Sequence, residues 1–67
     1  MATLELTITD WLRIIRAEFN EMPGLRLTAS QMQRLWGLDE MMCGALVQAL
    51  VAAGYLRRTS NGAYARA

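Results

Sequence analysis

Three stretches of this sequence share one pattern for starting a helix. A hydroxyl or carboxylate residue stands at the N-cap position, with an apolar residue directly before it and another at the fourth helical position. The three caps are Thr7, Thr28 and Asp39. Asp10 and Gln31 stand where they can complete capping boxes with the two threonines. Three helix starts within 67 residues predict a mainly helical fold and leave little chain for a large sheet.

Proline and glycine mark the helix ends. Pro23 follows Met22, and a residue before proline disfavours the helical conformation. Gly37 and Gly54 follow the second and third apolar stretches, where a left-handed residue commonly closes a helix. The predicted helices therefore cover residues 8–21, 29–36 and 40–53.

Apolar residues at helical spacing indicate which side of each helix is buried. Cys43 is expected to be a buried packing residue, and Met41 is the methionine expected on the surface. The expected core positions are Ile8, Leu12, Ile15 and Phe19 in the first helix, Met32 and Leu35 in the second, and Met42, Leu46, Leu50 and Ala53 in the third.

After the third helix, helical spacing gives way to alternation of apolar and polar residues. Two alternating stretches flank a turn sequence at 60–62 and predict a hairpin over residues 55–66. Residues 25–27 also alternate and predict a short third strand beside that hairpin. The fold class is therefore mainly α with a small β-hairpin, an α+β domain.

The length of the hairpin loop decides which residues share a face. A two-residue loop of Asn61 and Gly62 places Leu56 and Tyr64 on opposite faces. A three-residue loop with Gly62 in the left-handed conformation places them on the same face. We expect the three-residue loop, because it gives the hairpin one apolar face.

The composition restricts both stabilisation and chemistry. A chain this short buries only about 60% of its unfolded surface, so it needs dense packing, a staple or a partner. Cys43 is the single cysteine and the sequence has no histidine or lysine. This excludes an internal disulfide, a zinc site of Cys and His ligands, and the usual proton shuttles and nucleophile pairs of enzymes. We expect no catalytic residues, no metal and no cofactor.

The start of the chain and its longest uncharged run bear on location. Residues 1–5 lack the basic region and apolar run of a secretory signal. The run 41–56 contains Gly44, Gln48 and Gly54 and is shorter than the ~20 apolar residues of a membrane span. The expectation is a cytoplasmic protein without a membrane partner.

The order of these elements resembles a winged helix-turn-helix domain. Residues 27–38 resemble the first helix and turn of that motif. Leu46, Leu50 and the segments 54–56 and 62–64 resemble its recognition helix and wing in bacterial regulators of the MarR and IclR type. The resemblance covers roughly residues 9–66 and departs at Gln33, where the family usually has an alanine packed against the next helix.

The resemblance implies duplex DNA as a partner. The helix that begins at Asp39 would enter a major groove, while the hairpin would touch phosphate or the minor groove. Among the outward positions of that helix, only Gln48 can make a favourable contact to a base edge. The candidate DNA-binding residues are Arg57, Arg58, Arg66, Gln48, Asn61 and Arg26.

The charge distribution places the attraction for phosphate in the hairpin. The net charge of +1 combines four arginines and six acids in residues 1–54, a balance of −2, with three arginines and no acid in residues 55–67. The helix after Asp39 has no basic residue, and the acidic pair Asp39 and Glu40 at its start repels phosphate.

An interaction with another protein is the alternative. The outward positions of the third helix are apolar, and two apolar residues lie beside the core side of the first helix, so a homodimer or protein partner could cover them. The candidate interface residues are Trp11, Ile14, Met41, Gly44, Ala45 and Ala52. Two hypotheses stay open: a dimeric regulator or accessory factor that binds DNA, and an interaction module that keeps the fold without DNA.

Overall fold

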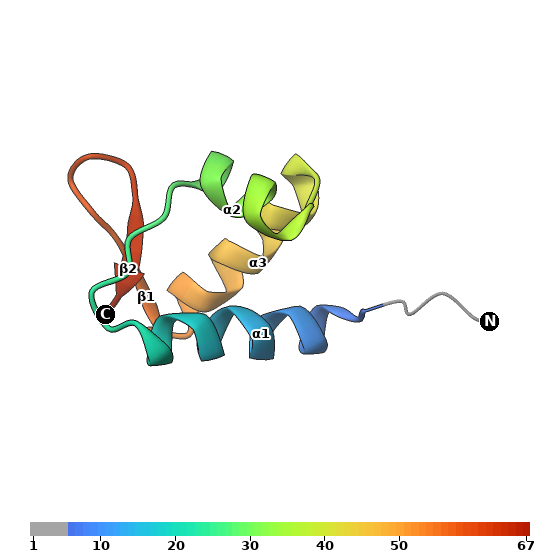
Figure 1. Ribbon diagram of the computed structural model, residues 1–67, viewed down its shortest axis with the longest axis horizontal. Coiled ribbons are helices and arrows are strands. Elements are labelled where there is room, and N and C mark those ends of the chain that lie inside the picture. Colours follow the sequence, from blue (N-terminus) through green and yellow to red (C-terminus); the bar gives the residue numbers. More distant parts are fainter. Residues whose placement is uncertain (1–5) are drawn as a thin grey trace.

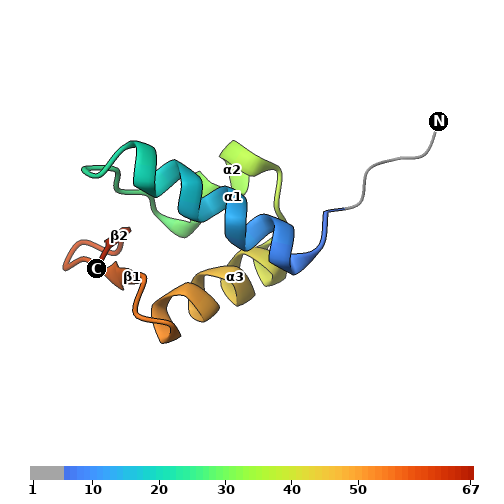
Figure 2. The same ribbon diagram turned by 90° about the horizontal axis from the view of Figure 1, so that it is seen from below.

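The computed structural model describes residues 6–67, which form three helices and one antiparallel hairpin. Helices α1 (Ile8–Glu21) and α3 (Glu40–Ala52) cross at an angle, as the two views in Figure 1 and Figure 2 show. The sequence predicts the bounds of α1 and α2 correctly, and α3 ends one residue earlier than predicted. The elements are α1 (Ile8–Glu21), α2 (Ala29–Trp36), α3 (Glu40–Ala52), β1 (Leu56–Arg58) and β2 (Tyr64–Arg66). The fold is therefore mainly helical with a two-stranded hairpin, an α+β arrangement.

All three predicted N-caps are confirmed. The Thr7 hydroxyl accepts the Asp10 N–H at 3.1 Å, and the Asp10 carboxylate accepts the Thr7 N–H at 3.0 Å. Thr28 and Gln31 form the same reciprocal pair, with distances of 3.1 and 2.9 Å. The Asp39 carboxylate accepts the backbone N–H three residues on at 2.7 Å. Each helix thus begins where side-chain oxygens satisfy its free N–H groups.

A short turn joins α2 to α3 and sets the angle between them. Gly37 has the left-handed backbone conformation, with φ of 64°, and its N–H donates to the carbonyl oxygen of Gln33. The Leu38 N–H donates to the same oxygen at 3.0 Å. The axes of α2 and α3 differ in direction by 116° across this turn.

Within residues 6–67, no single helix is long and apolar enough to cross a membrane. Only α2 and α3 taken together reach that length and composition, and the pair is bent by 116°. Residues 1–5, on which the expectation about a secretory signal rests, lie outside the described residues.

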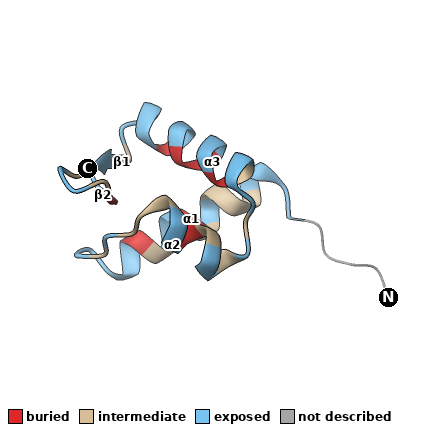
Figure 3. Cartoon of the chain, turned by 90° about the horizontal axis from the view of Figure 1, so that it is seen from above, coloured by how far each residue is buried: buried red, intermediate tan, exposed pale blue. Residues whose placement is uncertain are grey.

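The core lies between the three helices and the hairpin. Figure 3 shows that the buried side of α3 faces α1 and α2, while its opposite side is exposed. Cys43 is buried and Met41 is 86% exposed, as the sequence predicts. The central buried residues are Ile15, Phe19, Met32, Cys43, Leu46, Val47, Leu50 and Leu56.

Three predicted core positions are wrong. Ile8 is 52% exposed, Leu35 is 59% exposed and Ala53 is exposed. Ile8 is the first residue of α1 and Ala53 is the C-cap of α3, so each stands at a helix end that no other element covers. On α2, Met32 and Trp36 are one turn apart and both pack into the core, which leaves Leu35 turned outward.

The hairpin has the predicted three-residue loop. The Gly62 N–H donates to the Thr59 carbonyl oxygen at 3.1 Å, and the Thr59 N–H donates to the Ala63 carbonyl oxygen at 2.7 Å. Gly62 has a φ of 85°, the left-handed residue of this loop type. Leu56 and Tyr64 therefore lie on the same face, as expected.

The predicted strand at residues 25–27 is reduced to one residue. Leu27 forms an isolated antiparallel bridge with Tyr64, with N–H to oxygen distances of 3.1 and 2.7 Å. Thr28 directly after it is already the N-cap of α2, so the chain turns away after a single pair. This bridge still fixes the start of α2 beside β2.

Candidate functional site

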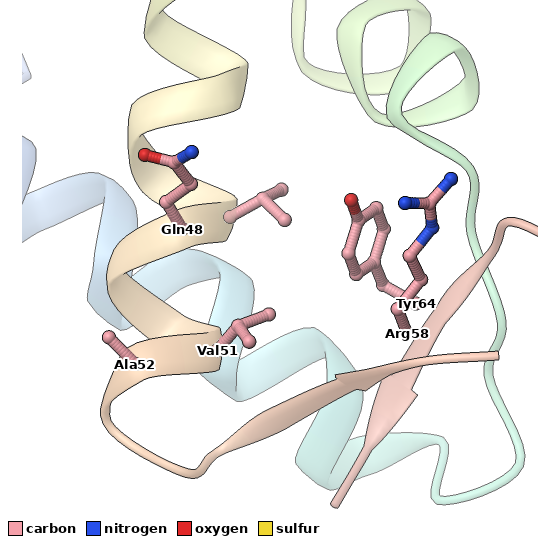
Figure 4. Close-up of a pocket in the computed structure, with 6 residues that line it drawn as sticks. Gln48, Val51, Ala52, Arg58 and Tyr64 are labelled. Carbon is pink, nitrogen blue, oxygen red and sulfur yellow. The ribbon is translucent and has the colours of Figure 1, made fainter.

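A groove of about 400 Å³ separates α3 from the hairpin. Figure 4 shows Gln48 on the α3 wall, with Arg58 and Tyr64 on the hairpin wall. Two of the predicted DNA-binding residues, Gln48 and Arg58, therefore line the same groove. The full lining is Val47, Gln48, Val51, Ala52, Arg58 and Tyr64.

The sequence interpretation named Ala52 only as an interface candidate and missed the rest of the apolar lining, Val47, Val51 and the ring of Tyr64. Val47 is buried with 4% of its surface exposed, whereas its neighbour Val51 is 39% exposed. Both valines stand one helical turn apart on the side of α3 that meets the hairpin. Tyr64 could have been found from its alternation with the hairpin residues, because it shares a face with Leu56 and Arg58.

The hairpin arginines do not form one patch. Arg58 pairs with Tyr64 across the hairpin, and Arg57 pairs with Ala65. Successive residues of a strand point to opposite faces, so Arg57 lies on the face away from Arg58 and Arg66. The predicted cationic cluster is thus divided between the two sides of the hairpin.

Arg66 is held near α1. Its guanidinium lies over the Tyr55 ring at 5.3 Å from the centroid, a cation–π contact. The Tyr55 hydroxyl lies 2.6 Å from Asn20 Oδ1 and 3.0 Å from the carbonyl oxygen of Arg16, both on α1. Tyr55 thus links α1 to the start of β1, and Arg66 at the end of β2 lies against its ring. Arg66 does not belong to the lining of the groove.

The other two DNA-binding candidates are Arg26, which lies beside the hairpin, and Asn61, which lies at its tip. Arg26 is exposed and precedes Leu27, which pairs with β2. Asn61 is exposed at the tip of the loop, where its Oδ1 accepts the Thr59 hydroxyl at 2.6 Å. The side chain of Asn61 therefore already stabilises the turn.

The outer face of α3, defined by Glu40, Met41, Gly44, Ala45, Gln48 and Ala52, is exposed at every position. Trp11 and Ile14, the other interface candidates, are half-buried on α1, and Trp11 packs against the core. The exposed side of α3 points away from α1 (Figure 3). The predicted interface residues therefore belong to two separate surfaces.

A second, smaller depression of about 290 Å³ lies on α2 and is lined by Ser30, Gln33 and Arg34. Gln33 is half-buried there. Gln33 thus places a polar side chain where the winged helix-turn-helix family usually has an alanine packed against the next helix.

The single thiol is part of the core. Cys43 Sγ lies 3.6 Å from the carbonyl oxygen of Ala29, and burial raises the pKa of the thiol above its usual value. A buried, protonated thiol is a poor nucleophile and metal ligand. Within residues 6–67 no three His, Cys, Asp or Glu side chains are grouped to hold a metal ion.

No family model, curated protein or solved structure matches this chain significantly. The function must therefore be inferred from the structure itself, and above all from the exposed surface that α3 and the hairpin form.

Proposed function

We propose that this chain is a winged helix-turn-helix domain that binds duplex DNA through the C-terminal half of α3 and the hairpin. The α2–α3 pair supports the fold part of this proposal, because its 116° angle lies within the ~90–120° of helix-turn-helix pairs and its short turn contains Gly37. The bridge from Leu27 to β2 and the position of the hairpin after α3 agree with a wing.

The observation that carries the DNA proposal is the shared groove of Gln48 and Arg58. A glutamine carboxamide can donate to and accept from a base edge, and an arginine guanidinium binds phosphate oxygens. Both residues are exposed, Gln48 on α3 and Arg58 on the hairpin beyond the Tyr64 ring (Figure 4). A DNA duplex lying along this surface would contact both residues.

The charges on α3 favour its C-terminal half as the part nearest to DNA. Glu40 stands in the first turn of α3 and repels phosphate, whereas Gln48 lies two turns later. The hairpin supplies the cations at that same end. We infer that phosphate attraction comes from Arg57 on one side of the hairpin and from Arg58 and Arg66 on the other, so that both sides of the hairpin would meet phosphate. Affinity should then depend strongly on salt and little on sequence. Such a protein would act as a regulator or an accessory factor.

A salt series with a fluorescently labelled mixed-sequence duplex tests this proposal. Three phosphate contacts give a slope of about −3 in a plot of log affinity against log salt concentration. The double variant Arg57→Ala, Arg58→Ala should lose about two thirds of this slope. Arg13→Ala removes an exposed charge from α1 and should leave the slope unchanged. Absence of binding at low salt, or equal losses in both variants, would overturn the proposal.

The exposure of Met41 favours a second candidate, a protein-interaction module. Its side chain is 86% exposed, and the outer face of α3 around it carries Gly44, Ala45 and Ala52. Covering such a surface with a partner removes apolar area from water. This candidate is centred on Met41 in the first half of the outer face, and it shares Ala52 at the far end of α3 with the groove of the DNA candidate.

Sedimentation analysis separates this candidate from the first. Met41→Glu should abolish self-association without changing helicity, because an exposed side chain contributes little to folding. Ser60→Glu introduces the same charge in the exposed hairpin loop and should leave association intact. Equal sedimentation of the native chain and the Met41→Glu variant would exclude the outer face of α3 as a dimer surface.

A further inference from the structure

The groove between α3 and the hairpin is lined by apolar side chains and by the polar groups of Gln48, Arg58 and Tyr64, which form its polar rim. Val47 and Val51 and the ring of Tyr64 form the apolar part. The Gln48 carboxamide stands on the α3 side of the rim. On the hairpin side, the Tyr64 hydroxyl and the Arg58 guanidinium extend side by side in the same direction (Figure 4).

The polar groups on this rim are free to bind a ligand. The hydrogen bonds found within residues 6–67 do not use Arg58, the Tyr64 hydroxyl or the Gln48 side chain. The lining contains no carboxylate that could neutralise Arg58. A guanidinium and a phenol beside an apolar surface thus offer donors to an anion whose remaining atoms are apolar.

We propose that this groove binds a small monocarboxylate with an aliphatic tail of medium length. The carboxylate accepts from the Arg58 guanidinium and the Tyr64 hydroxyl, and the tail lies against Val47 and Val51. The volume of about 400 Å³ falls within the ~300–1,000 Å³ that small-molecule sites occupy. An aliphatic tail suits a lining of valine methyl groups, and the charge of Arg58 selects an anion over a neutral or cationic head group.

The groove ligand would also compete with DNA, since Arg58 and Gln48 belong to both surfaces. This regulatory consequence rests on the proposed function, whereas binding of the carboxylate does not. A chain whose wing arginine is occupied by a carboxylate loses a phosphate contact and with it part of its affinity for a duplex.

Titration of the ¹⁵N-labelled chain with sodium octanoate, below the concentration at which it forms micelles, tests the ligand site. Saturable amide shifts are expected at Val47, Gln48, Val51, Arg58 and Tyr64. Two reference compounds separate head from tail: 1-octanol has the tail without the charge, and propanoate has the charge with a short tail. Each should bind at least about tenfold more weakly than octanoate. Equal affinity of 1-octanol, or shifts spread over the whole chain, would overturn the proposal.

Two variants of one strand provide a matched pair. Arg58→Gln removes the charge at the groove and should weaken octanoate binding about tenfold or more. Arg57→Gln removes the same charge from the opposite face of β1 and should leave binding unchanged. Thermal unfolding of both variants confirms that they fold. Equal losses in the two variants would indicate general charge attraction and contradict a site at Arg58.

A competition experiment separates the ligand site from the DNA proposal. Octanoate should release the labelled duplex from the native chain, with no such effect of 1-octanol. Octanoate binding without release would overturn the regulatory consequence and leave the ligand site standing. A chain that binds octanoate but no duplex would overturn the proposed function alone.

Discussion

The outer face of α3 and the hairpin are neighbouring surfaces with opposite character. The outer face carries Glu40 and the exposed Met41, and α3 has no basic residue. The hairpin carries three arginines and no acid. In protein–DNA complexes, phosphate contacts position the protein and base contacts specify the sequence. In the proposed function these two tasks would be divided, with Gln48 on the helix and the arginines on the hairpin.

The same two regions contribute unequally to the core. Cys43, Leu46, Val47 and Leu50 of α3 are buried, whereas Leu56 is the one large side chain that β1 and β2 bury. Stability is therefore expected to depend on the helices. The following predictions test this division, from the largest expected effect to the smallest.

The buried and exposed sides of α3 should respond very differently to truncation. Leu46 is fully buried, so Leu46→Ala should lower the free energy of unfolding by about 2–5 kcal/mol. Met41 is 86% exposed, so Met41→Ala should change it by less than about 0.5 kcal/mol. Urea denaturation followed by circular dichroism measures both. Similar losses in the two variants would mean that the outer face of α3 is covered, for instance by a second copy.

The junction between α3 and the hairpin depends on one glycine. Gly54 has a φ of 77°, and no atom lies within 4 Å of where its Cβ would stand, so Gly54→Ala meets a backbone cost without a clash. That cost is about 1–2 kcal/mol. Gly44 lies within α3 with equal space, and Gly44→Ala should stabilise the chain by about 0.5–1 kcal/mol. The two variants should shift the urea midpoint in opposite directions, and a shift in the same direction would contradict the assigned backbone conformations.

The hydrogen bonds that attach the hairpin to α1 should contribute less to the free energy of unfolding than the features tested above. Tyr55→Phe removes the hydroxyl that bonds to Asn20 and to the Arg16 carbonyl, at a cost of about 1 kcal/mol. For a domain of this size that corresponds to a thermal midpoint lower by about 4–8 °C. Tyr64→Phe removes a hydroxyl without a partner in the described residues and should leave the midpoint almost unchanged. If Tyr64→Phe lowered the thermal midpoint more than Tyr55→Phe, the hairpin would be held mainly by its contacts with α3 and not by those with α1.

The smallest effect concerns pH at the N-terminus of α1. Hydrogen bonds from the backbone and side chain of Thr7 lower the pKa of Asp10 below its usual 3.8. The stabilising effect of the ionised carboxylate is therefore present above 3.8 and is lost as pH falls through the lower, folded-state pKa. NMR titration of the Asp10 carboxyl should give a midpoint below 3.8. A midpoint at or above that value would contradict the capping box.

The sequence predicted those features that depend on residues close together in the chain. Thr7 with Asp10, Thr28 with Gln31, and the left-handed Gly62 are local arrangements, and all of them are present. Sequence patterns fail to predict the burial of a side chain when that burial depends on an element distant in the sequence. Whether Leu35 is buried depends on how α2 packs, because Trp36 occupies the neighbouring core position.

The candidate site shows the same limit. The sequence proposed Gln48 and Arg58 separately as DNA-binding candidates, one on a helix and one on the hairpin. Their meeting in one groove depends on where α3 ends and the hairpin folds back, which is a long-range property. The contact of Arg66 with Tyr55 is also non-local in origin, because it follows from the strand pairing that brings the two ends of the hairpin together.

Titration of the ¹⁵N-labelled chain with a mixed-sequence duplex at low salt tests most directly whether the hairpin and the end of α3 form a DNA-binding surface. The division of tasks predicts shifts at Gln48, Arg57 and Arg58 that disappear as salt is raised, with the Met41 amide unaffected. Absence of shifts at low salt, or shifts confined to the first turns of α3, would contradict it.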